Sequence, residues 1–100
     1  MESIKLILHY SSIIYLKAKQ SLFKVGQEDP FIYFILFGRM KLYRDDDSRL
    51  GEVLNIGWTV GEEILFDKEA KSRQEKCIGI EETCLVGIER KHFISCKKIL

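Results

Sequence analysis

The sequence predicts a mainly β fold, an antiparallel double-stranded β-helix (jelly roll) sandwich with short flanking helices. Short runs rich in β-branched and aromatic residues follow one another along most of the chain, and glycines or charged residues separate them. Helical spacing of apolar residues is confined to the two ends. The chain has 100 residues, 46% of them hydrophobic, which is enough for one core. We therefore expect one domain, with a helix at 1–11, the jelly roll at 12–89 and the start of a second helix at 90–100.

The first helix is predicted from the apolar residues Ile4, Ile7 and Leu8, which recur at helical spacing behind a candidate N-cap, Ser3. The strands are then expected at residues 13–16, 21–25, 31–37, 39–44, 51–56, 76–81 and 83–89. The run 31–37 is apolar throughout, so it should lie deepest. In 39–43 apolar and charged residues alternate, which is typical of a strand with one face on a core.

A single helical turn is expected at residues 62–66, where two acids precede apolar residues. Another helix should begin near Arg90, because Phe93, Cys96 and Leu100 fall along one side of it. No repeat, low-complexity tract or linker is visible.

Composition narrows the range of partners and locations. A net charge of +1 provides no field that attracts nucleic acid or an anionic membrane. The first residues lack the features of a secretory signal, and no apolar run approaches the roughly 20 residues that span a bilayer. We expect a cytoplasmic protein, without membrane insertion and without a nucleic-acid partner.

The cysteines and histidines do not form a metal-binding or disulfide pattern. Cys77, Cys84 and Cys96 are an odd number without a Cys-x-x-Cys pair, so buried, reduced thiols are expected. His9 and His92 lie at opposite ends of the chain, which weighs against a metal site. Because no nucleophile is accompanied by a positioned base, we expect no enzymatic activity and no cofactor.

The glycines carry the strongest signal about function. Gly26 precedes the strand 31–37, which ends at Gly38, and the pair Gly57 and Gly61 precedes the expected turn at 62–66. An arginine, Arg73, follows in a polar loop. This order and spacing resemble those of the cyclic nucleotide-binding domain family, the module of protein kinase regulatory subunits, gated channels and catabolite-activator-type transcription factors, over about four fifths of the chain.

The resemblance implies a phosphate-binding cassette for cAMP or cGMP. The ligand would bind where backbone N–H groups of the helical turn point at its phosphate, and a glycine at 61 permits close approach. Glu62 matches the family's glutamate that accepts a hydrogen bond from the ribose 2′-hydroxyl, and Arg73 matches the arginine that pairs with the phosphate. The implied ligand-binding residues are Gly61, Glu62, Glu63, Ile64, Leu65, Arg73, Gln74 and Glu75.

Several positions depart from the family pattern. Gln74, Glu75 and Lys76 stand where small residues are usual, and a glutamate near a phosphate weakens binding unless it turns to water or pairs with a lysine. The loop 67–72 is about two residues longer than usual. Val60 replaces an aromatic residue, Trp58 replaces an acid, and a further C-terminal lid helix is missing.

Two functions remain open from the sequence. The first is a regulatory module that binds cAMP or cGMP. The second is a degenerate domain that has lost the ligand and serves as a structural or interaction subunit of a larger assembly, as in axonemal or scaffold relatives, which also leaves a cytoskeletal or ciliary location open. A protein partner is expected in either case, and Gln74 does not indicate which base is preferred.

Overall fold

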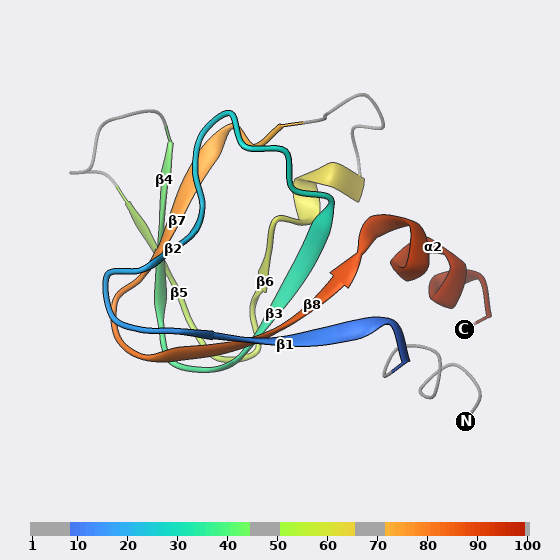
Figure 1. Cartoon of the computed structure of the whole chain (residues 1–100), viewed down its shortest axis with the longest axis horizontal. Helices are drawn as coiled ribbons and strands as arrows, with labels where there is room; N and C mark the ends of the chain where they lie inside the picture. The colour runs from blue at the N-terminus through green and yellow to red at the C-terminus, as the bar shows by residue number, and fades with distance from the viewer. Residues whose placement is uncertain (1–8, 45–50, 66–71, 100) are drawn as a thin grey trace.

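A computed structural model describes residues 9–44, 51–65 and 72–99. In these residues two four-stranded antiparallel sheets face each other, with a helix at the C-terminal end (Figure 1). The elements are β1 (Ser11–Leu16), β2 (Ser21–Phe23), β3 (Phe31–Phe37), β4 (Met40–Arg44), β5 (Glu52–Leu54), β6 (Thr59–Val60), the single 3-10 turn η2 (Glu62–Leu65), β7 (Glu75–Gly79), β8 (Thr83–Glu89) and α2 (Arg90–Ile99).

The strand order confirms the predicted jelly roll. One sheet has the order β1-β8-β3-β6 and the other β2-β7-β4-β5, so the chain passes repeatedly from one sheet to the other. Strands that neighbour each other in space are therefore mostly distant in sequence. The turn η2, for example, contacts β3.

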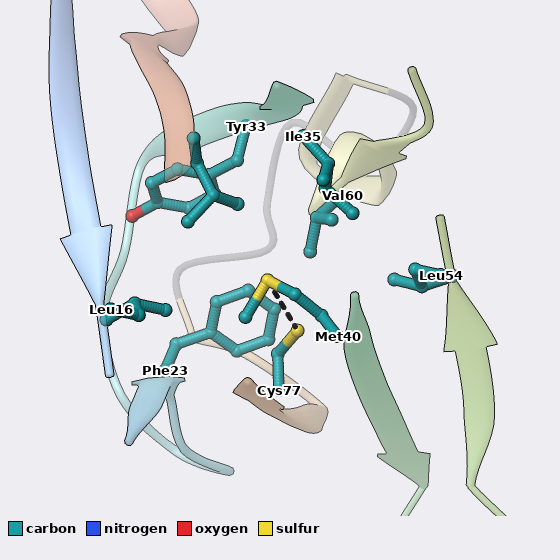
Figure 2. Close-up of a cluster of buried hydrophobic side chains, with 9 residues drawn as sticks. Leu16, Phe23, Tyr33, Ile35, Met40, Leu54, Val60 and Cys77 are labelled. Atoms are coloured by element: carbon teal, nitrogen blue, oxygen red, sulfur yellow. Dashed lines mark hydrogen bonds between the residues drawn. The ribbon is translucent and has the colours of Figure 1, made fainter. Parts of the chain in front are cut away.

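The core lies between the two sheets. Apolar side chains from both sheets meet there, and Figure 2 shows them converging around Met40 and Cys77, whose sulfur atoms lie 3.9 Å apart. The cluster comprises Leu16, Phe23, Tyr33, Ile35, Met40, Leu54, Val60, Cys77 and Leu85. Cys77 and Cys84 are buried thiols that form no disulfide, as expected. The side chain of Cys96 lies outside the part of the chain that the structure describes.

Strand β3 is buried only as far as Ile35. Ile32, Tyr33 and Ile35 are buried, but Leu36 and Phe37 are 50% and 40% exposed. The register of β3 on β8 shifts between Ile35 and Phe37, which turns the end of the strand toward the surface. The expectation that 31–37 lies deepest was therefore wrong for its last two residues.

The short strand β6, which was not predicted from the sequence, forms one edge of the first sheet. β6 pairs with β3 at Tyr33 and Phe34. It follows a tight turn in which the Trp58 N–H donates to the Asn55 carbonyl oxygen over 3.1 Å. Because of this turn, β5 covers only the middle of the run predicted at 51–56.

The two ends of the described chain lie side by side (Figure 1). The ring of Tyr10 stacks on that of His92 in α2, with centroids 4.0 Å apart, and Phe93 contacts Phe34 on the outer face of β3. Most of the helix predicted at 1–11 lies outside the described residues, although β1 already begins at Ser11. Among the helices of the described ranges, none has the length and apolar character needed to cross a bilayer.

Candidate functional site

Arg73 lies two residues before β7 and is held there by the loop that follows β2. Its backbone N–H donates to the Gln27 carbonyl oxygen over 2.8 Å, and its own carbonyl oxygen accepts from Gly26 over 2.7 Å. The residue is only 1% exposed. Its guanidinium lies 4.4 Å from the centre of the Phe23 ring, in a cation–π contact. The fold therefore buries a side chain that is positively charged at any physiological pH.

The guanidinium of Arg73 contacts the glycine that precedes η2. Nη1 donates to the Gly61 carbonyl oxygen over 2.9 Å, and Nη2 donates to the Phe31 carbonyl oxygen. Gly61 has a φ of +82°, and a Cβ added there would lie 2.6 Å from Nη1. Glycine is thus required at this position both by its backbone conformation and by the closeness of the arginine. The structure brings together the two residues that the resemblance singled out.

Two carboxylates balance the charge of Arg73. Oδ2 of Asp29 lies 3.5 Å from Nη2, and Oε1 of Glu63 lies 3.1 Å from Nη1. Neither contact was predicted from the sequence, where Glu63 was expected to bind the ligand as part of the helical turn. The Nε donor of Arg73 is buried and has no hydrogen-bond partner among the described residues.

Asp29 is fixed by its neighbours in β3. Its carboxylate accepts hydrogen bonds from the Tyr33 hydroxyl, at 3.0 and 2.9 Å, and from the Phe31 N–H over 3.1 Å. Burial, with a smaller contribution from the Asp29 charge, raises the pKa of Tyr33 far above its usual value, so the hydroxyl remains a donor. An acid directly before a proline and a strand is a common turn signal, but nothing in the sequence links it to Arg73.

A cavity of about 440 Å³ lies beside Gly61 and opens between β5, β6 and η2. Its volume is in the range of small-molecule sites. The lining residues come from both sheets and from η2: Leu42, Glu52, Leu54, Trp58, Thr59, Val60, Gly61, Glu62, Glu63 and Glu75. Four of them are glutamates and none is a cation, so the described wall of the cavity is acidic.

The site residues expected from the sequence do not all line the cavity. Gly61, Glu62, Glu63 and Glu75 line the cavity, whereas Arg73 lies behind Gly61 and Glu63 and does not reach the wall. Gln74 is exposed. Ile64 and Leu65 complete η2, which has the single turn that was expected. The ligand-binding role of all of them stays a prediction.

Other chemistry is poorly supported at this site. No group of three or more metal-ligating side chains occurs within the part of the chain that the structure describes. Burial raises the pKa of the Cys77 thiol from 9.0 to about 12, which makes it a poor nucleophile.

The fold is shared with several solved structures. The sensor domain of the transcriptional regulator DNR from Pseudomonas aeruginosa is 19% identical, with a TM-score of 0.87 over 98% of this chain and 70% of that one. A cyclic nucleotide-binding-like protein from Brucella abortus is 25% identical, with a TM-score of 0.76 over 97% and 84%. The regulatory subunit of a cAMP-independent protein kinase A from Trypanosoma brucei is 17% identical, with a TM-score of 0.82 over 97% and 36%.

Sequence comparison gives the family. Curated protein sequences include no significant match to this chain. The family model for the cyclic nucleotide-binding domain matches residues 13–98, which include all but the first two residues of the sheets, the cavity and Arg73. The order of strands, the glycine at 61 and the buried arginine agree with that match, and this chain belongs to the cyclic nucleotide-binding domain family.

Proposed function

We propose that this domain is a non-catalytic regulatory module that binds a cyclic nucleotide, cAMP or cGMP, in the cavity beside Gly61. Arg73 is the counter-charge for the phosphate. The observation that carries the proposal is the 2.9 Å hydrogen bond from Arg73 Nη1 to the Gly61 carbonyl oxygen, next to a cavity of about 440 Å³.

The arginine suits this task in its chemistry. A guanidinium keeps its proton at any physiological pH and donates two parallel hydrogen bonds to phosphate oxygens. Its Nε donor is buried without a partner among the described residues, a costly state that an acceptor atom of a ligand would relieve. The Phe23 ring and the Phe31 carbonyl oxygen hold the guanidinium in one orientation, so little freedom is lost on binding.

The rest of the nucleotide fits the composition of the cavity. Glu62 lines it and is exposed, as a carboxylate that accepts a hydrogen bond from a ribose hydroxyl must be. Trp58 and Leu54 supply apolar surface on which a purine packs. We place the phosphate at the side of the cavity nearest Gly61 and Arg73.

A second candidate function has its own support. The charge of Arg73 is already balanced by Asp29 and Glu63, and four glutamates line the cavity, an arrangement that repels an anion. A domain of this kind would serve without a nucleotide, as a structural or interaction subunit of a larger assembly. The Trypanosoma brucei relative, described as part of a cAMP-independent kinase, shares the fold.

Titration calorimetry with cAMP and with cGMP distinguishes the two. The nucleotide-binding function predicts saturable heat with one site per chain, and a loss of at least about tenfold in affinity for Arg73→Lys, because an ammonium cannot replace two parallel guanidinium bonds. The absence of heat at millimolar nucleotide with folded wild-type protein would leave the ligand-free function.

A further inference from the structure

The two carboxylates that contact Arg73 differ in how firmly they are held. The Asp29 side chain is 5% exposed and accepts hydrogen bonds from two donors of β3, the Tyr33 hydroxyl and the Phe31 N–H. The Glu63 side chain is 45% exposed, and its interaction in the described residues is the single contact with Arg73. Asp29 is therefore a fixed partner of the arginine, and Glu63 is a partner that can leave.

Glu63 also lies on the side of Arg73 that faces the cavity. The side chain of Arg73 is 0% exposed and does not contribute to the cavity wall, whereas Glu63 does. A ligand in the cavity therefore meets the Glu63 carboxylate before it meets the guanidinium. Like a phosphate, this carboxylate is an anion with oxygen acceptors at hydrogen-bond distance from Nη1.

We infer that Glu63 is a built-in competitor for the phosphate of the ligand: its carboxylate occupies Nη1 of Arg73 when the cavity holds no anion, and it swings into solvent when a phosphate takes its place. This inference rests on the proposed function and adds a regulatory element to the same site. In this way an arginine that is buried and paired with carboxylates can still bind a phosphate.

Displacement of Glu63 does not leave the Arg73 guanidinium without partners. Arg73 would still have Asp29 at 3.5 Å and the carbonyl oxygens of Gly61 and Phe31 as acceptors. The released carboxylate is already 45% exposed, so its hydration changes little when it leaves Arg73. An ion pair with one buried and one half-exposed member is intermediate in strength between a surface pair and a fully buried one.

The competitor lowers affinity without altering the ligand contacts. Glu63 is tethered beside Arg73, so it competes at a high effective concentration, and the ligand's free energy must first break the Arg73–Glu63 contact. Removing the carboxylate charge should raise nucleotide affinity by about tenfold, the ratio that corresponds to an ion pair of this intermediate strength.

The test is calorimetry with cAMP and cGMP on Glu63→Gln, with Glu52→Gln as the matched control. Both variants remove one negative charge from the wall of the same cavity, but only Glu63 contacts Arg73. We expect Glu63→Gln to bind about tenfold more tightly than wild type and Glu52→Gln to differ from wild type by no more than about threefold. Glu63→Ala, which also removes the hydrogen-bond acceptor, should behave like Glu63→Gln, and thermal melts should show that all three are folded.

Each outcome separates the inference from the proposed function. If wild type binds and Glu63→Gln binds equally or less well, the competitor is refuted and the proposed function stands. If both variants gain affinity equally, the acidic wall acts as a general field and Glu63 has no special role. If wild type shows no binding but Glu63→Gln does, the competitor is supported and the native domain is nucleotide-free. If folded wild type, Glu63→Gln and Glu63→Ala all fail to bind, both ideas are overturned.

Discussion

Nη1 of Arg73 donates a hydrogen bond to the carbonyl oxygen of Gly61 over 2.9 Å, although the two residues are separated by η2 and the loop that follows it. This contact connects the residue that follows β6, in one sheet, to a residue just before β7, in the other. It makes Arg73 a structural residue as well as the proposed phosphate ligand. Variants at this position must therefore be assayed for stability before their binding is interpreted.

Replacing Arg73 with alanine should destabilise the domain by about 3–5 kcal/mol, because Asp29 would remain buried without its cation. Arg73→Lys should destabilise the domain less, because the lysine ammonium keeps the positive charge beside Asp29. Some loss should remain, because an ammonium does not reproduce the paired hydrogen bonds of the guanidinium to the Gly61 and Phe31 oxygens. Urea unfolding followed by tryptophan fluorescence measures both. Equal stability of wild type and Arg73→Ala would refute a structural role for the arginine.

Gly61→Ala should be more destabilising than Gly57→Ala. Both glycines have positive φ, +82° and +85°, so both substitutions carry the backbone penalty of about 1–2 kcal/mol. Only at position 61 would the new Cβ collide with the Arg73 guanidinium, since nothing lies within 4 Å of a Cβ at position 57. The difference between the two urea midpoints isolates the contact with Arg73. Equal midpoints would show that the Arg73 side chain moves aside without loss of stability.

Tyr33→Phe should cost about 1–2 kcal/mol of stability, because it removes the hydroxyl that donates to the buried Asp29 carboxylate. Tyr15→Phe is the control, since Tyr15 is 66% exposed and should tolerate the change. Thermal unfolding compares the two. A loss for Tyr15→Phe as large as that for Tyr33→Phe would argue against the specific bond to Asp29.

Stability should fall in alkaline solution because of Cys77. Burial raises the pKa of its thiol from 9.0 to about 12, so the folded state keeps a proton that the unfolded state releases above pH 9. The contribution is complete below pH 9 and is lost as the pH rises toward 12, with a slope of up to about 1.4 kcal/mol per pH unit. In Cys77→Ala the slope of unfolding free energy against pH should be shallower between these limits. An unchanged slope would mean that the thiol is not protected in the folded state.

The sequence predicted the fold well because the alternating strands and the turn glycines are local signals. The runs at 31–37, 39–44 and 83–89 all form strands, and η2 forms at the expected turn. The two-residue strand β6 was missed because its pairing with β3 depends on a turn closed by Asn55 and Trp58, with too few residues to show a period.

The candidate site was only half predictable. Gly61 and Arg73 were found through the family resemblance, and they are in contact. Asp29 and Glu63 were not linked to Arg73, because ion pairs between residues on different sheets and loops leave no periodic pattern in a sequence. Nor did the sequence indicate that Glu52, Glu62, Glu63 and Glu75 would share one cavity wall, since strands and loops from both sheets bring them together.

The central claim is that the Arg73 guanidinium receives a phosphate, and nuclear magnetic resonance of its side chain tests this most directly. Adding cAMP or cGMP should shift the Arg73 Nε–Hε signal and the backbone amide signals of η2 along one saturable curve, and adenosine, which lacks the phosphate, should leave the Arg73 signal in place. If saturating nucleotide leaves the Arg73 signal unmoved, or if adenosine shifts it equally, the phosphate does not bind at this arginine and the account is wrong.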